Sequence, residues 1–169
     1  LLEINRLEMG KIDLKLESFD LKEILLSLIN LWREKAQVKN IEIVSQWDET
    51  PVMIQTDKHL LFQILENLLS NALKYSPYDA SVWLEMGCSS NECTIQIRDQ
   101  GPGLSVEDQG KLFQKFTRLS SQPTGGESSN GLGLSIVKYL AEQLHGRVGC
   151  QSQLGQGACF TLTLPLGQV

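Results

Sequence analysis

Three polar side chains on one predicted helix are the first residues of this chain that could do chemistry. Asn67, Asn71 and Lys74 belong to a segment, 58–75, whose leucines and isoleucines recur at helical spacing. At 100° per residue these three side chains and that of Gln63 fall within about 80° of one another and share a face. Amide oxygens suit a Mg²⁺ ion already bound to phosphates, and a lysine one turn away can reach a phosphate. The stripe therefore predicts a metal-phosphate site, with a solvated polar helix face as the alternative.

A carboxylate followed by two glycines makes a second candidate group. Asp99 ends an apolar, strand-like segment and precedes Gly101 and Gly103. A carboxylate in this place can accept a hydrogen bond from an exocyclic amine, and the glycines let a flat ring approach the backbone. The arrangement favours recognition of a nucleobase, and an ordinary Asp-Gly turn is the alternative.

A glycine-rich block further along the chain predicts an anion site at the start of a helix. The block consists of Gly131, Leu132, Gly133 and Leu134. Backbone amides at a helix N-terminus bind anions, and glycine permits close approach. The block is neither a Walker A loop nor a dinucleotide-binding fingerprint. Arg118 stands just before a stretch rich in Ser, Gly and Pro, which we expect to be a mobile loop, and could swing onto a terminal phosphate. A plain glycine-rich loop and a surface arginine are the alternatives.

Apolar periodicity predicts the elements that must position these groups. Helices are expected at 1–8, 21–38, 58–75, 107–116 and 132–144, the second and third capped by Asp20 and Asp57. Strands are expected at 11–16, 41–47, 52–55, 82–88, 93–98, 147–152 and 158–164. Hairpins in the middle and at the end favour a two-layer α/β (α+β) sandwich over a doubly wound parallel sheet. We expect a mixed, mostly antiparallel sheet of about five strands packed on about three helices.

Composition narrows the classes of protein. With 169 residues the chain has room for one ordinary core, and a net charge of −5 argues against a nucleic-acid binder. No apolar run approaches the ~18 residues of a membrane span, so we expect no direct membrane contact. The four cysteines form no CxxC pair, which argues against a zinc site. Reduced thiols in a cytoplasmic protein are expected, although the sequence leaves a disulfide open.

In this order and spacing the motifs resemble the catalytic, ATP-binding domain of bacterial sensor histidine kinases. That domain belongs to a wider ATPase group shared with gyrase B, the Hsp90 chaperones and MutL. Residues 67–75 resemble the N box of the family, 99–103 the G1 box, 113–116 the F box and 131–134 the G2 box. Residues 155–165 resemble its closing hairpin.

The resemblance implies ATP and Mg²⁺ as ligands and assigns roles to single residues. Asn67 and Asn71 would hold Mg²⁺, Lys74 would touch phosphate, Tyr75 would lie against the adenosine and Asp99 would read the adenine amine. Other residues matched to nucleotide binding are Gly101, Gly103, Gly131, Leu132, Gly133 and Leu134. Residues 117–130 would form the ATP lid, with Arg118 reaching the γ-phosphate.

The resemblance also implies partners that the chain lacks. Residues 1–10 resemble the end of a dimerisation-domain helix and its linker, which leaves 11–169 as the catalytic domain. The implied activity transfers the γ-phosphate of ATP to a histidine on that separate dimerisation domain. The full-length kinase would have a response regulator receiver domain as a further partner. That full-length parent could be membrane-anchored. His59 and His145 are badly placed as acceptors, so we do not expect the fragment to autophosphorylate. Dimerisation would come from the missing helices, so we expect a monomer.

Three other functions remain open from the sequence. A catalytically silent nucleotide-binding or interaction module is one, because Ser129 and Asn130 precede Gly131 where the family often reads Gly-Thr, and Ala158 replaces a common threonine. A hydrolytic ATPase is another, although Asn67 stands where such relatives use a glutamate base. A serine kinase of the anti-sigma type shares the same fold.

Overall fold

The computed structural model describes residues 12–115, 117, 119–126 and 133–167. Its centre is a five-stranded sheet with the strand order β2-β4-β5-β7-β6. The strands are β2 Glu42–Gln46, β4 Ser81–Cys88, β5 Glu92–Arg98, β6 Arg147–Ser152 and β7 Ala158–Pro165. β2 and β4 pair in parallel, and the other neighbours pair antiparallel. The predicted mixed, mostly antiparallel sheet is confirmed, together with both hairpins.

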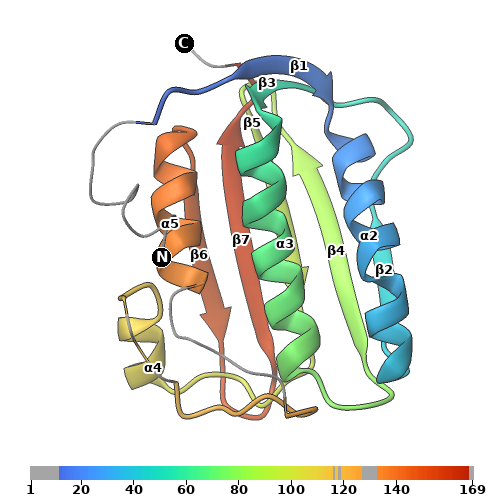
Figure 1. Ribbon diagram of the computed structural model, residues 1–169, viewed down its shortest axis with the longest axis vertical. Helices are drawn as coiled ribbons and strands as arrows, with labels where there is room; N and C mark the ends of the chain where they lie inside the picture. The colour runs from blue at the N-terminus through green and yellow to red at the C-terminus, as the bar shows by residue number, and fades with distance from the viewer. Residues whose placement is uncertain (1–11, 116, 118, 127–132, 168–169) are drawn as a thin grey trace.

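Three helices cover one face of this sheet (Figure 1). They are α2 Leu21–Val38, α3 Lys58–Tyr75 and α5 Gly133–Gln143. Leu25 of α2, Leu65 of α3 and Leu84 of β4 are fully buried because the apolar stripe of each helix faces the sheet. The chain therefore forms the two-layer α/β sandwich that its sequence predicts.

The helix that carries the candidate metal ligands is fixed at both ends. Asp57 caps the start of α3, where its Oδ1 accepts a hydrogen bond from the Leu60 N–H at 3.1 Å. At the other end the buried Lys39 amine donates to the carbonyl oxygens of Leu73, at 2.8 Å, and Lys74, at 3.1 Å. These carbonyls have no partner within the helix, and a cation there also complements the helix dipole. The last turn of α3 is thereby held in place.

The strand predicted at 11–16 is wrong in its bounds. The observed β1, Leu16–Asp20, pairs antiparallel with β3, Met53–Asp57, in a separate two-stranded sheet. Their ladder stops at Leu16 because β3 ends at Asp57, where α3 begins, and the Lys15 N–H donates instead to Asp57 Oδ2 at 2.9 Å. The apolar alternation before Leu16 reflects packing against the core by Ile12 and Leu14, not pairing.

A short helix, α4 Val106–Lys111, lies at the end of the layers where α3 ends and α5 begins (Figure 1). β1 and β3 lie at the opposite end. α4 is shorter than the predicted helix at 107–116, because after Lys111 the chain turns and buries Leu112 in the core. The predicted helix at 1–8 lies outside the described residues.

The cysteines depart from the expectation of reduced thiols. Cys88 and Cys93 form a disulfide, while Cys150 and Cys159 are free. The tight turn between β4 and β5 places Cys88 directly opposite Cys93, and sequence spacing alone does not reveal that register. Among the described helices, none is both long and apolar enough to cross a membrane.

Candidate functional site

A cavity lies where α3 ends, β5 ends and α5 begins. Five of its lining residues are ones that the sequence singled out: Asn71, Tyr75, Asp99, Gly103 and Leu134. They come from three segments far apart in the chain, and the fold brings those segments to the same end of the layers (Figure 1). Polar groups converging on a concave apolar surface are typical of a small-molecule site.

Asp99 is the buried acid of this cavity, with only 6% of the residue exposed. Its Oδ1 accepts hydrogen bonds from the backbone N–H groups of Gly101, at 2.8 Å, and Ala158, at 3.2 Å. Burial raises the pKa of Asp99, and these two hydrogen bonds oppose the rise. Both bonds that the described residues make to this carboxylate are at Oδ1, so Oδ2 is left to accept a hydrogen bond from a ligand.

The glycines after Asp99 let the loop pass close to its neighbours. A Cβ at Gly101 would lie 2.7 Å from the carbonyl oxygen of Tyr75, which lies at the end of α3. Gly103 has a φ of +71°, and a Cβ there would overlap the carbonyl oxygen of Gln153 in the turn between β6 and β7. Side chains at these two positions would push the loop away from α3 and from the β6–β7 turn.

The polar stripe of α3 extends from the cavity toward the start of α5. Asn67 lies one turn before Asn71, and a Cβ at Gly133 would lie 2.7 Å from Asn67 Oδ1. Gly133 therefore allows α5 to begin directly against the Asn67 amide. Lys74 lies in the last turn of α3, and its carbonyl oxygen accepts a hydrogen bond from the Thr124 N–H at 2.9 Å.

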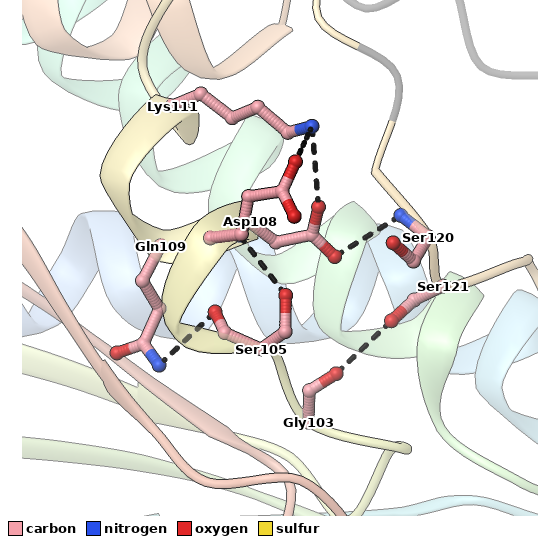
Figure 2. A network of polar contacts seen from close by, with 8 residues as sticks. Gly103, Ser105, Asp108, Gln109, Lys111, Ser120 and Ser121 are labelled. Carbon is pink, nitrogen blue, oxygen red and sulfur yellow. Dashed lines mark hydrogen bonds and ion pairs between the residues drawn. The ribbon is translucent and has the colours of Figure 1, made fainter.

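The opposite wall of the cavity comes from the end of α4 and from residues 119–126, which form neither helix nor strand. Its lining residues are Leu112, Leu119 and Ser121. Figure 2 shows two hydrogen bonds that fix it: the Ser120 N–H donates to Asp108 Oδ2 at 3.1 Å, and the Ser121 hydroxyl donates to the Gly103 carbonyl at 3.0 Å. Together with the Thr124 contact to the end of α3, these two bonds hold residues 119–126 over the cavity.

Sequence reasoning gave several of the lining residues no role of their own in the site, although most lie in segments that it matched to the family. Pro102 lies within 99–103, Leu119 and Ser121 lie within the predicted lid at 117–130, and Ala158 and Phe160 lie within 155–165. Leu104 and Leu112 lie outside these segments. The inward alternation along β7 could have pointed to Phe160, but nothing in the sequence distinguishes Ser121 from the rest of the predicted lid.

Three predicted site residues, Arg118, Gly131 and Leu132, lie outside the described residues, and their roles stay predictions. Within the described part of the chain, no group of three or more His, Cys, Asp or Glu side chains could hold a metal ion. A metal at this site would therefore depend on amide oxygens, water and the ligand's own oxygens.

Comparison with known families decides the class of the chain. Residues 56–168 match the family described as histidine kinase-, DNA gyrase B-, and HSP90-like ATPase. The chain belongs to this family. The matched region includes Asn67 and Asn71 of α3, Asp99 and the glycine-rich block 131–134, which runs into the start of α5.

Two curated relatives of this ATPase-family chain are sensor histidine kinases. It is 32% identical over 167 residues to the circadian input-output histidine kinase CikA of Synechococcus elongatus, covering 98% of this chain and 22% of that protein. It is 36% identical over 175 residues to the sensor histidine kinase GacS of Pseudomonas protegens, covering 98% and 19%. The chain thus spans about a fifth of the length of such relatives. It is a catalytic ATP-binding domain of the sensor histidine kinase type.

Solved structures agree with this assignment. Full-length ShkA in complex with AMPPNP superposes with a TM-score of 0.85 at 30% identity, covering 99% of this chain and 35% of that one. The catalytic domain of the histidine kinase ThkA superposes with a TM-score of 0.79 at 20% identity, covering 92% of this chain and 99% of that one. At that identity the ThkA likeness shows the fold alone.

Proposed function

We propose that this chain binds Mg²⁺-ATP and transfers the γ-phosphate to a histidine on a separate helical dimerisation domain. The observation that carries the proposal is the buried Asp99 carboxylate, whose Oδ1 is held by two backbone N–H groups while Oδ2 can accept from an adenine amine. The glycines beside it leave room for a flat ring against the backbone. The AMPPNP complex of ShkA, a protein 30% identical to this chain, supports a nucleotide in this cavity.

The polar stripe of α3 fits the phosphate end of such a ligand. Asn67 and Asn71 would contribute neutral oxygens to Mg²⁺, whose remaining ligands would be phosphate oxygens and water. The metal, when bound, neutralises charge on the phosphates. Lys74 and Arg118 would contact the phosphates as cations, and Tyr75 would lie against the adenosine. Asn67 cannot act as a base on water, so the residues favour transfer over hydrolysis.

Catalysis would consist mainly of positioning, because the acceptor histidine supplies the nucleophile. The chain's own histidines are too far from the site to serve. His59 lies in the first turn of α3, about 24 Å along the helix axis from Tyr75. His145 follows the far end of α5 from Gly133. We therefore expect phosphotransfer to need an added acceptor domain. Without the dimerisation helices we expect the fragment to be monomeric. A response regulator would be the next partner of the whole kinase.

Calorimetric titration with a non-hydrolysable ATP analogue, with and without Mg²⁺, tests the proposal. Asp99→Asn places an amide where the adenine amine needs an acceptor, so the affinity is expected to fall about 100-fold with the fold retained by circular dichroism. Asp48→Asn, an exposed loop substitution with the same change of charge, is the matched control. Asn71→Ala is expected to remove the Mg²⁺-dependent part of the affinity and to preserve bare nucleotide binding.

A kinase assay completes the test once a phosphorylatable acceptor domain from a related sensor kinase is added. The chain is expected to label the acceptor domain and not itself. Absence of analogue binding by the folded wild-type chain would overturn the proposal. Normal phosphotransfer by both Asp99→Asn and Asn71→Ala would overturn the residue assignments.

A further inference from the structure

A buried carboxylate outside every sequence motif lies behind the second wall of the nucleotide cavity. Asp108, on α4, is 1% exposed (Figure 2). Its Oδ2 accepts a hydrogen bond from the Ser120 N–H at 3.1 Å, and its Oδ1 lies 3.7 Å from the Lys111 amine. Ser120 is the second residue of the described lid segment, residues 119–126, two positions after Arg118 in the sequence. The carboxylate therefore holds the backbone of the predicted lid at its start.

The surroundings of Asp108 keep it charged. Burial alone would raise its pKa, but hydrogen bonds with Ser120 and Ser105 and the charge of Lys111 together hold the pKa below its ordinary value. An ionised acceptor makes a stronger hydrogen bond to a backbone N–H than a neutral one. A buried charge of this kind is costly to leave unpaired, so the Ser120 N–H is held firmly.

The helix that carries Asp108 is itself tied to the floor of the cavity. The Gln109 side-chain amide donates to the carbonyl oxygens of Leu104, at 3.2 Å, and Ser152, at 3.0 Å. The next residue after Ser120 completes the connection, because the Ser121 hydroxyl donates to the Gly103 carbonyl at 3.0 Å. The backbone at Ser120 and Ser121 is therefore held by two neighbouring hydrogen bonds, one to Asp108 and one to Gly103, and Ser121 lines the cavity.

We propose that Asp108 is a positioning residue for nucleotide binding, which fixes the lid backbone at Ser120 and so presents Leu119 and Ser121 as a preformed wall of the cavity. The inference rests on the proposed function, because it assumes that the cavity takes ATP. If the wall is already ordered in the free protein, binding does not have to supply the free energy for ordering it, and the affinity is higher. Asp108 would act through the lid backbone and would not touch the nucleotide.

Two charge-neutralising substitutions on the same helix separate this role from a general loss of charge. Asp108→Asn is expected to weaken binding of the Mg²⁺-bound ATP analogue about tenfold, as expected for the loss of one charged hydrogen bond. Glu107→Gln is the control. Its side chain is 85% exposed and pairs with the same Lys111, at 3.4 Å, and among the described residues it forms no hydrogen bond or ion pair with the lid segment. It is expected to bind within about twofold of the wild type.

Hydrogen exchange and a double substitution identify the route of the effect. In Asp108→Asn the backbone amides of residues 119–124 are expected to exchange faster while those of α3 keep their protection. Ser120→Pro removes the donated N–H, together with the hydroxyl and part of the backbone freedom at Leu119, and it carries the test if Asp108→Asn fails to fold. The double variant is expected to bind no more weakly than either single variant, because both remove the same contact. With an added acceptor domain, KM for ATP is expected to rise while kcat is retained.

The outcomes distinguish this inference from the proposed function. If the folded wild-type chain does not bind the analogue, the proposed function fails and the inference fails with it. If the wild type binds but Asp108→Asn and Ser120→Pro bind as the Glu107→Gln control does, the inference alone is overturned. Additive effects in the double variant would also overturn it, since Asp108 would then act by another route.

Discussion

The two walls of the nucleotide cavity are built in different ways. The helix wall consists of Asn71, Tyr75 and Asp99, and the lid wall consists of Leu112, Leu119 and Ser121. In the helix wall the side chains project from the last turns of α3 and from the end of a central strand. In the lid wall two of the three residues lie in a segment without helix or strand.

The difference lies in what holds each wall. The Asp99 N–H donates to the Ala158 carbonyl at 2.9 Å, which continues the pairing of β5 with β7 beyond Arg98. α3 packs its leucines into the core along the same wall. In the lid wall Leu112 is buried in the core and Leu119 packs against it, whereas the rest of residues 119–126 is held by hydrogen bonds to Asp108, Gly103 and the end of α3. Substitutions that displace the backbone of the helix wall should therefore disturb fold and recognition together, whereas those that remove a hydrogen bond of residues 119–126 should change affinity alone.

Gly157→Ala is expected to have the largest effect, because it strikes the backbone that holds Asp99. Gly157 has a φ of +74°, and a Cβ there would overlap the Asp99 carbonyl oxygen. We expect a loss of about 3 kcal/mol in the free energy of unfolding, from backbone strain and overlap together. Displacement of Asp99 should also weaken ATP-analogue binding by more than about tenfold. Urea unfolding and calorimetry measure the two effects.

Gly155→Ala is the matched control for this prediction. Gly155 has a φ of +80°, but a Cβ there would meet no atom within 4 Å. Only the backbone strain applies, so the expected loss is about 1 kcal/mol with near-normal binding. Equal effects of the two alanines would show that close packing against Asp99 does not hold the helix wall, and the comparison of walls would fail.

The helix wall is also the part that the sequence predicted well. The bounds of α3 follow from Asp57 as its cap and Pro77 beyond its end, and the structure has the helix at Lys58–Tyr75 as expected. The two hairpins and the glycines after Asp99 follow from equally local signals. Local signals were enough here because helix and strand periodicity place whole rows of side chains at once.

The lid wall was not predictable in the same way. The contacts of Ser120 with Asp108 and of Ser121 with Gly103 join residues 12 and 18 positions apart without any repeat in the sequence. α4 is shorter than its apolar pattern suggested, because burial of Leu112 ends it early. The bounds of β1 were mispredicted for the same reason, because they depend on where β3 ends, and β3 lies far along the chain.

The two walls should respond differently to acid pH, because the pKa values of their buried carboxylates are shifted in opposite directions. Burial raises the pKa of Asp99, whereas its partners lower that of Asp108. As pH falls, Asp99 takes up a proton while Asp108 stays charged, and a protonated Asp99 loses the acceptor for an adenine amine. We expect affinity to fall about tenfold per pH unit once the pH drops below the raised pKa of Asp99. Calorimetry from pH 7 down to pH 4.5 measures it.

The sign of the accompanying stability change distinguishes this loss from unfolding. A folded-state pKa above the unfolded value means that protonating Asp99 favours the folded state, so its contribution rises as pH falls. Asp108 contributes stability above its unfolded pKa, and that is lost only as pH falls through its lowered folded pKa. Burial, with the nearby charges of Asp99 and Cys159, raises the pKa of Cys150 to about 12, so that thiol does not titrate here. Asp99→Asn should bind the ATP analogue weakly at every pH. If its affinity fell with pH as steeply as that of the wild type, the titrating group would not be Asp99.

Thr124→Val is expected to have the smallest effect, because it removes one contact of the lid segment and leaves the backbone contact beside it. The Thr124 hydroxyl donates to the carbonyl oxygens of Lys74 and Ser76, while its N–H donates to Lys74 independently. Valine keeps the shape and the N–H, so we expect about a two- to threefold loss of ATP-analogue affinity and an unchanged urea midpoint. Thr94→Val, the same exchange on β5, should change neither quantity by more than the error of measurement. A lowered urea midpoint in Thr124→Val would mean that the lid wall shares in global stability, as the helix wall does, and the distinction between the walls would then lie only in their secondary structure.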